Sequence, residues 1–174
     1  MLQLSAALVN RPVLSLRTGG EVATAIGVII NPHNLKVEGW YCEDRFDKNQ
    51  TLILLSQDVR DIIKQGLVVN DHDVLVEPTE LIRLQSILEI QFELLGKPVI
   101  TVDKQKIGKL TDYAVDMPSL YVQKLYVTQP LIKSFSGGSL SVDRNQIVEI
   151  TTRKIVINNP LQPTKSPIVA PLTP

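Results

Sequence analysis

The feature that most constrains this fold is an internal repeat. Five stretches of the first half of the chain recur, in the same order, in the second half. The matched stretches are residues 9–16 with 95–102, 26–27 with 107–108, 35–42 with 120–127, 58–63 with 143–148, and 67–70 with 155–158. Their offset changes from 86 to 81, 85 and 88 where turn residues cluster, as insertions in loops would produce. The ordered matches indicate a duplicated domain.

Each half has the pattern of short β-strands. Residues 12–16 and 98–102 are mostly apolar or β-branched, and each begins with a proline, which a strand tolerates at its first position. Residues 120–127 alternate with a phase slip between Val122 and Leu125, which predicts a β-bulge. The first half slips in the same way, and Trp40, the counterpart of Leu125, is therefore expected to be buried. Short strands at this density favour a small barrel in each half.

One segment departs from the β pattern. Its apolar residues recur at spacings of three and four, at Leu81, Leu84, Leu88, Phe92 and Leu95. This spacing predicts a helix over residues 79–95, started by Pro78 and Thr79, ended by Gly96, and covered by both barrels.

The predicted fold is therefore mainly β, with two small barrels in tandem. The first barrel spans residues 1–77, the connecting helix 78–95 and the second barrel 96–159. Residues 160–174 contain five prolines and are expected to form a flexible extended tail that is dispensable for folding.

A family resemblance rests mainly on the second half. Residues 96–99 read Gly-Lys-Pro-Val, a charged turn follows, and residues 106–109 read Lys-Ile-Gly-Lys. With the alternating strand at 120–127 and the segments 143–150 and 155–157, this pattern resembles the PRC-barrel family. That family includes the H subunit of photosynthetic reaction centres and the C-terminal domain of the ribosome maturation factor. The resemblance covers residues 95–158 and, with a longer first hairpin, residues 9–77.

The resemblance implies strongly bent barrels that act as protein-interaction modules. It implies no catalytic residue, because the family shares none. A full ribosome maturation factor carries a His-Gly motif near its start, and nothing like it occurs here. The first half therefore resembles a second PRC barrel.

Candidate reactive residues are few. His72 and Asp73 could bind a metal if the fold supplied further ligands, but the surrounding turn residues favour a polar turn. His33 is interpreted as the tip of a hairpin. Cys42 could be a nucleophile, but it has no His or Lys nearby and matches Val127, which favours an apolar barrel position. As the single cysteine, it excludes an internal disulfide and favours a cytoplasmic location.

The acidic and glycine-rich stretches also fit structural roles better than functional ones. Glu43, Asp44, Asp47 and Asp58 could form paired carboxylates, but their spacing does not fit a calcium-binding loop, and a solvated hairpin is preferred. The Gly-Gly pairs at 19–20 and 137–138 are interpreted as turns, because neither precedes a Lys-Ser/Thr pair. Residues 81–95 are too short and too charged to cross a bilayer, so no membrane insertion is expected.

Charge is divided unevenly between the halves. The chain has 18 basic and 18 acidic residues, which argues against a general nucleic-acid binder. Seven basic and ten acidic residues precede residue 78, whereas residues 96–159 hold nine and five. The candidate partner-binding residues are Lys97, Lys104, Lys106, Lys109, Asp143 and Arg144. They are interpreted as a docking patch for an acidic partner or RNA, or alternatively as an edge-protecting hairpin and a local Asp143–Arg144 pair.

These observations predict a non-catalytic adaptor or scaffold that binds a protein partner and needs no metal or cofactor. The alternative is an RNA- or ribosome-associated assembly factor that uses the basic face of the second barrel. A third hypothesis is an enzyme or metal protein centred on His72 and Asp73. Nucleic acid is not the favoured partner, and self-association is left open.

Overall fold

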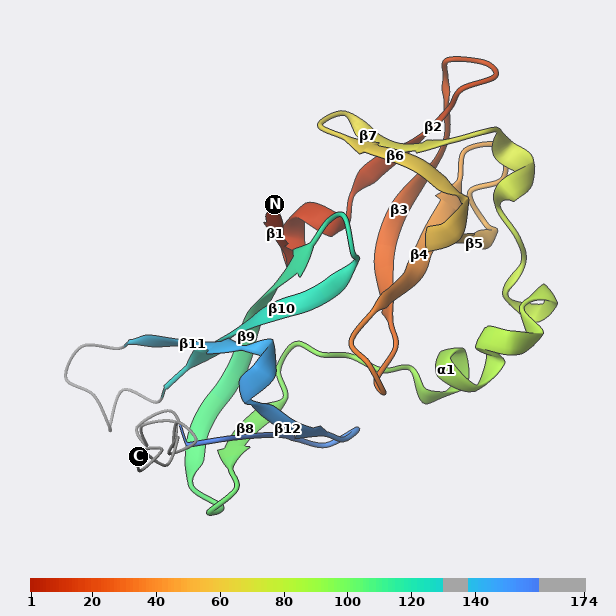
Figure 1. The fold of residues 1–174 in the computed structure, drawn as a ribbon. Coiled ribbons are helices and arrows are strands. Elements are labelled where there is room, and N and C mark those ends of the chain that lie inside the picture. The colour runs from red at the N-terminus through yellow and green to blue at the C-terminus, as the bar shows by residue number, and fades with distance from the viewer. Residues whose placement is uncertain (130–137, 160–174) are drawn as a thin grey trace, which may run out of the picture.

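Two β-sheets, built one from each half of the chain, make up most of the molecule (Figure 1). The computed structural model describes residues 1–129 and 138–159, and the expected C-terminal tail lies outside them. The strands of the first sheet are β2 (Arg11–Ser15), β3 (Glu21–Ile30), β4 (Val37–Asp44), β5 (Thr51–Leu55), β6 (Val59–Ile63) and β7 (Gly66–Val69). The strands of the second sheet are β8 (Pro98–Thr101), β9 (Lys106–Asp116), β10 (Tyr121–Thr128), β11 (Ser139–Asp143), β12 (Ile147–Ile150) and β13 (Ile155–Ile157), joined by β1 (Leu2–Leu4).

The two sheets have the same topology. The strand order is β5-β4-β3-β2-β7-β6 in the first and β11-β10-β9-β8-β13-β12 in the second. Neighbours are antiparallel except for the pairs β2–β7 and β8–β13, which are parallel in both sheets. A short 3₁₀ helix also follows the edge strand in each half, at η2 (Ser56–Asp58) and η6 (Arg144–Gln146). The predicted duplication is therefore confirmed as two equivalent sheets. The prediction of two barrels is corrected, because both sheets are open at their outer strands in the described residues and one curls only into a half-barrel.

Strand pairing corrects two of the sequence matches. The partners of β3 and β4 correspond to those of β9 and β10 at a constant offset of 85, so Gly27 matches Asp112 and not Gly108. The pairings of β6 and β12 require an offset of 88, so the match of residues 58–63 to 143–148 is three residues out of register. Short apolar stretches can be aligned with one another at several registers. Only the hydrogen-bonded pairing of the strands shows which register is correct.

The predicted bulge is confirmed in both halves. The register of β10 on β9 shifts between Val122 and Lys124, and that of β4 on β3 shifts at the equivalent place, between Val37 and Gly39. Trp40 follows this shift and is fully buried, as predicted.

The predicted helix over residues 79–95 is wrong in its extent. The segment instead forms two 3₁₀ turns, η4 (Pro78–Glu80) and η5 (Ile82–Leu84), and a six-residue helix, α1 (Gln85–Ile90). Helical structure ends at Gln91, whose φ is 49°. The sheets cover the predicted apolar face only in part, since Leu95 is 45% exposed, whereas Leu94 lies in the core. The chain leaves the helix at Gln91, three residues before Leu94.

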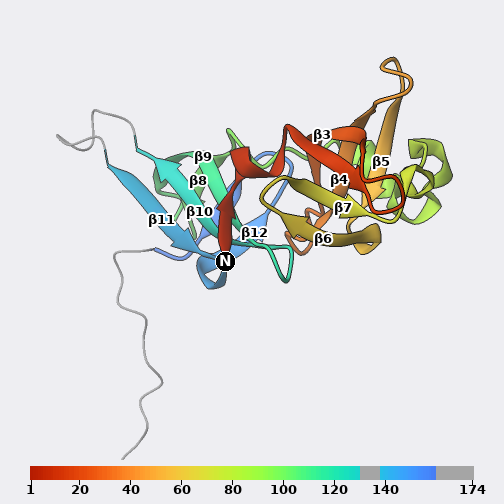
Figure 2. The same cartoon turned by 90° about the horizontal axis from the view of Figure 1, so that it is seen from above.

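The halves meet in a symmetric way. The Val37 N–H donates to the Leu120 carbonyl (2.8 Å), and the equivalent Val122 N–H donates to the Leu35 carbonyl (2.9 Å). Each half thus gives the other the same bond that it receives, as an approximate twofold axis requires. One hydrophobic core contains residues of both halves, and Figure 2 shows the N-terminal segment running between the two sheets.

Candidate functional site

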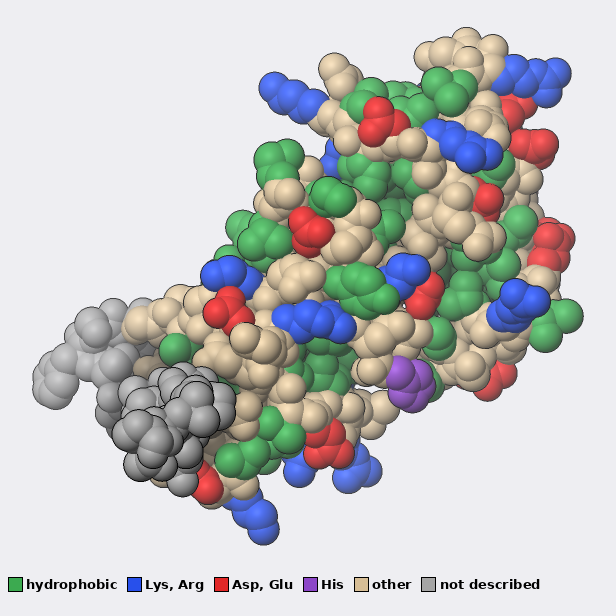
Figure 3. Space-filling view, viewed as in Figure 1, with side chains coloured by type: hydrophobic (Ala, Val, Ile, Leu, Met, Phe, Trp, Pro, Cys, Tyr) green, Lys and Arg blue, Asp and Glu red, His purple; other side chains and the backbone are tan. Residues whose placement is uncertain are grey.

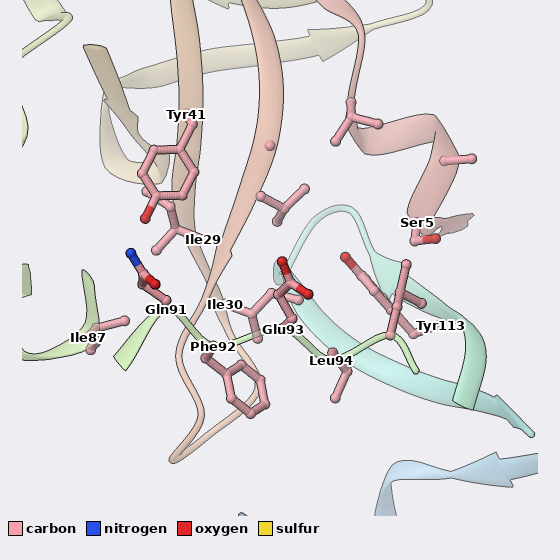
Figure 4. Close-up of a pocket in the computed structure, with 15 residues that line it drawn as sticks. Ser5, Ile29, Ile30, Tyr41, Ile87, Gln91, Phe92, Glu93, Leu94 and Tyr113 are labelled. Atoms are coloured by element: carbon pink, nitrogen blue, oxygen red, sulfur yellow. The ribbon is translucent and has the colours of Figure 1, made fainter. Parts of the chain in front are cut away.

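A groove of about 800 Å³ lies beside β3, between the two halves (Figure 4). One wall is formed by residues 27–30 of β3 and by Tyr41. The opposite wall is formed by Ile87 and residues 91–95, and Ser5, Ala6 and Tyr113 complete the lining. The groove is mostly apolar and has the size of a typical ligand-binding cavity.

The groove exists because β3 is longer than the strand beside it. β2 pairs with β3 only as far as Ala25, and in the described residues β3 pairs with β4 alone from Gly27 to Ile30. The equivalent edge of β9 is occupied, because β1 pairs there with residues 114–116. β3 therefore presents backbone groups that a further strand could bond.

Tyr113 supplies a polar group to this apolar groove. Its side chain is 6% exposed, and Figure 4 shows its hydroxyl directed into the groove, toward the side on which Glu93 lies. Burial, with a smaller contribution from Asp112, raises the pKa of Tyr113 to about 12, so the hydroxyl is protonated at neutral pH. Among the described residues it has no hydrogen-bond partner, although a buried tyrosine hydroxyl usually finds one. The groove therefore offers a neutral donor to a bound acceptor.

The predicted basic patch is only partly a free surface. Lys104, Lys106 and Lys109 are exposed on the β8–β9 hairpin. Lys97 is half-buried, because its Nζ lies 4.8 Å from the Phe92 ring centre and donates to the Thr152 carbonyl (2.5 Å). On the face shown in Figure 3, basic and acidic side chains are interspersed.

The predicted local pair of Asp143 and Arg144 is wrong. Asp143 pairs with Lys124 (3.3 Å). The Arg144 guanidinium donates to the carbonyls of Val122 (3.0 Å) and Asn34 (2.6 Å), and it stacks on the Tyr121 ring. Arg144 thus joins the halves instead of presenting its charge to a partner, because the twofold arrangement brings a turn of the first half beside it.

His72 pairs with a residue that the sequence did not suggest. Its Nε2 lies 2.9 Å from Oδ1 of Asp44, and Asp73 is exposed. Asp44 is buried, which corrects the expectation that it belongs to a solvated hairpin. Burial alone would raise the pKa of Asp44, but hydrogen bonds from His72 and the Phe46 amide outweigh it and lower that pKa. In the part of the chain that the structure describes, no group of three or more His, Cys, Asp or Glu side chains is placed to hold a metal.

Cys42 lies at an apolar core position and His33 lies at a hairpin turn, as the sequence predicted. The Cys42 side chain is fully buried, and this burial raises the pKa of its thiol to about 12, so it is not a reactive thiolate at neutral pH. His33 lies in the turn between β3 and β4, where its N–H donates to the Asn31 side chain. Gly19 and Gly20 lie in the β2–β3 turn, and Gly137 is outside the described residues.

Sequence reasoning missed Tyr113 and the free edge of β3. Neither could be inferred from local patterns, because the segments that line the groove are far apart in the sequence. A signal for the edge was present in the sequence, because residues 88–94 match residues 2–8, which form and follow the strand on the equivalent edge.

Comparison with known proteins gives no family assignment. No protein-family model matches the chain, and no curated protein matches it. Within the described residues, no helix is both long enough and apolar enough to cross a membrane.

Proposed function

We propose that this protein is a non-catalytic interaction adaptor built from two PRC-type barrels, and that the groove beside β3 binds an extended segment of a protein partner. The observation that carries the proposal is the edge of β3 at residues 27–30, which pairs with β4 on one side and, among the described residues, with no strand on the other.

An extended peptide suits this edge for physical reasons. Main-chain hydrogen bonds to a free sheet edge provide affinity, and adjoining apolar pockets select side chains. Ile29 and Ile30 are 4% exposed, so this part of β3 is packed into the protein beside the groove. The Tyr113 hydroxyl can donate to a carbonyl or side-chain oxygen of the peptide.

The test uses a photo-cross-linking amino acid at Glu93, on the rim of the groove, in the full chain expressed in its native cell. The matched control carries the same amino acid at the exposed Lys48, on the β4–β5 loop. A defined protein is expected to be captured from position 93 and not from position 48. Filling the groove with Ala6→Trp should abolish that capture, because Ala6 lines the groove but is itself exposed. Equal capture at both positions would refute the proposal.

The RNA-associated alternative depends on the three exposed lysines of the β8–β9 hairpin. The same cross-linker at Lys106 tests it directly. Recovery of RNA at that position, lost when Lys104 and Lys109 are changed to Glu, would favour the assembly-factor function over the adaptor.

A further inference from the structure

The internal repeat begins earlier than the first paired strands. Residues 2–14 read Leu-Gln-Leu-Ser-Ala-Ala-Leu-Val-Asn-Arg-Pro-Val-Leu, and residues 88–100 read Leu-Glu-Ile-Gln-Phe-Glu-Leu-Leu-Gly-Lys-Pro-Val-Ile. The offset is 86 throughout. The structure supports this match, since Leu8 and its counterpart Leu94 are both buried in the core. Asn10 and its counterpart Gly96 also share the left-handed backbone conformation, with φ of 55° and 81°.

The first three residues of the two segments nevertheless differ in conformation. Residues 2–4 form β1, which pairs with residues 114–116 of β9. Residues 88–90 form the end of α1. The site equivalent to that of β1 lies at residues 29–31, where the groove begins and where no strand is added in the described chain.

Two anchors that hold β1 are missing at the equivalent site. Asp112 Oδ1 accepts hydrogen bonds from the Ser5 hydroxyl (2.6 Å) and the Ser5 N–H (3.2 Å), but its counterpart is Gly27. The Met117 N–H donates to the Met1 carbonyl, but its counterpart, Pro32, has no N–H. A strand formed by residues 88–90 would thus be less stable than β1.

The helical conformation of residues 88–90, as the end of α1, is also only weakly stabilised. α1 has six residues, none of them buried, and no side-chain cap at its N-terminus. So short a helix is not stable by itself in water and depends on packing. Both conformations of residues 88–90 are therefore marginal, which is the condition for a switch between them.

We propose that residues 88–90 are a built-in strap that exchanges between α1 and a strand on β3, and that the strand form closes the groove. This regulation rests on the proposed function, because the strap would occupy the edge assigned to the partner. The register of β1 sets the pairing: Leu88 lies opposite Asn31, Glu89 opposite Ile30 and Ile90 opposite Ile29.

The experiment is disulfide cross-linking in the full chain, with Cys42→Val removing the native thiol. Leu88→Cys with Asn31→Cys should form an intramolecular disulfide on oxidation, because opposite residues of paired strands bring their Cβ atoms close. Leu2→Cys with Asp116→Cys is the positive control, since these residues are already paired. Gln85→Cys with Asn31→Cys is the negative control, because Gln85 lies outside the strand register. Mass spectrometry of non-reduced protein reports the bonds.

The missing anchor can be restored to strengthen the test. Gly27→Asp with Gln91→Ser copies the Ser5–Asp112 contact, and Gly27 faces Tyr41 as Asp112 faces Tyr126. The rate of disulfide formation between positions 88 and 31 should rise about fivefold or more, because the copied contact contains two hydrogen bonds and one net hydrogen bond alone corresponds to about fivefold. Hydrogen exchange at residues 88–90 should slow in the same variant without the added cysteines, which covers the case that the cysteine variants fail to fold.

The outcomes separate this inference from the proposed function, because cross-linking needs no partner. Absence of the 88–31 bond in both backgrounds, with the 2–116 bond formed, would overturn the strap. So would a bond formed only between two copies of the chain. Failure to capture a partner from the groove would overturn the adaptor function and leave the strap standing as a conformational property.

Discussion

Trp40 connects a strand of the first sheet with the N-terminal segment. Its indole is fully buried, and Nε1 donates to the Leu8 carbonyl at 3.1 Å. Its counterpart Leu125 is equally buried but has no donor, so this bond is specific to the first half.

We expect Trp40→Phe to lower the free energy of unfolding by about 1–3 kcal/mol, because a buried carbonyl loses its partner. Urea unfolding followed by circular dichroism measures this change. Leu125→Met, a change of similar volume without a lost hydrogen bond, should cost less than about 1.5 kcal/mol. Equal losses in the two variants would contradict the role assigned to the indole.

The Asp44–His72 pair makes stability depend on acid pH. The pKa of Asp44 is lowered in the folded protein relative to its ordinary value, which lies near 4 in the unfolded chain. The folded state therefore binds this proton less readily than the unfolded state. The stabilisation is fully present above pH values near 4 and is lost as the pH falls through the folded pKa.

We accordingly expect Asp44→Asn to lose stability at pH 7 and to show a smaller further loss on acidification than the wild type. Urea midpoints measured from pH 7 to pH 2.5 test this. Asp103→Asn, on an exposed turn, is the matched control. An acid dependence in Asp44→Asn as steep as that of the wild type would show that other groups cause it; Asp71 and Asp116, whose pKa values are also lowered, are the candidates.

At the scale of elements, the parallel pair β2–β7 depends on a close backbone approach. Gly66 begins β7, and a Cβ atom at this position would collide with the Pro12 carbonyl. The collision could be relieved only by moving β7 away from β2. These two strands are neighbours inside the first sheet, and their pairing links β6 and β7 to the other four strands.

Gly66→Ala is therefore expected to destabilise the protein by about 2 kcal/mol or more, since a small residue is replaced in a filled space. Gly20→Ala is the control, because its Cβ would meet only the Thr18 hydroxyl at an ordinary distance of 3.7 Å. Thermal unfolding compares the two variants. A Gly66→Ala protein as stable as Gly20→Ala would mean that β2 and β7 can separate at little cost.

The linker shows how element-scale prediction fails. Its apolar residues have helical spacing, and this spacing correctly indicated a helix but not its length. A periodic pattern states which face is apolar and says nothing of what covers it. Here Leu94 lies in the core and Leu95 is 45% exposed, and the helix ends before either residue.

At the scale of the whole molecule, the halves behave as one body because they share a core and a symmetric junction. Arg144 is one of the long-range connections between the halves, because its guanidinium reaches Asn34, 110 residues away. Trp40 lies in the first half, so it reports on the consequences of a change at Arg144 in the second.

We expect Arg144→Ala to lower the free energy of unfolding by about 1–2 kcal/mol. This value lies toward the low end of the range for hydrogen bonds of charged groups, because the Arg144 side chain is only half-buried. Trp40 fluorescence and far-ultraviolet circular dichroism should show the same urea midpoint, since the core is continuous. Lys124→Ala, which breaks an exposed pair, should cost less than about 1 kcal/mol. Separate midpoints for the two probes in the wild type would contradict a single cooperative unit.

The sequence by itself determined the duplication, the β class, the shared bulge and the burial of Trp40 and Cys42. These features follow from local patterns: alternation of apolar residues sets which side chains face the core, and clustered turn residues set where strands end. The same patterns recur in both halves, so each half corroborates the other. That is why Val37 and Val122 could be matched before any contact was known.

Only the tertiary structure decided the register of β3 on β4, the length of α1, the pairing of His72 with Asp44, and the place of Arg144 between the halves. Each depends on a partner distant in the chain, and no local pattern specifies which of several chemically equivalent partners the fold will bring near. The groove beside β3 has the same origin. It exists because β1 pairs with the edge of β9, whereas the equivalent edge of β3 has no added strand in the described residues. Asp112 and Met117 hold β1 on β9 through their hydrogen bonds to Ser5 and Met1.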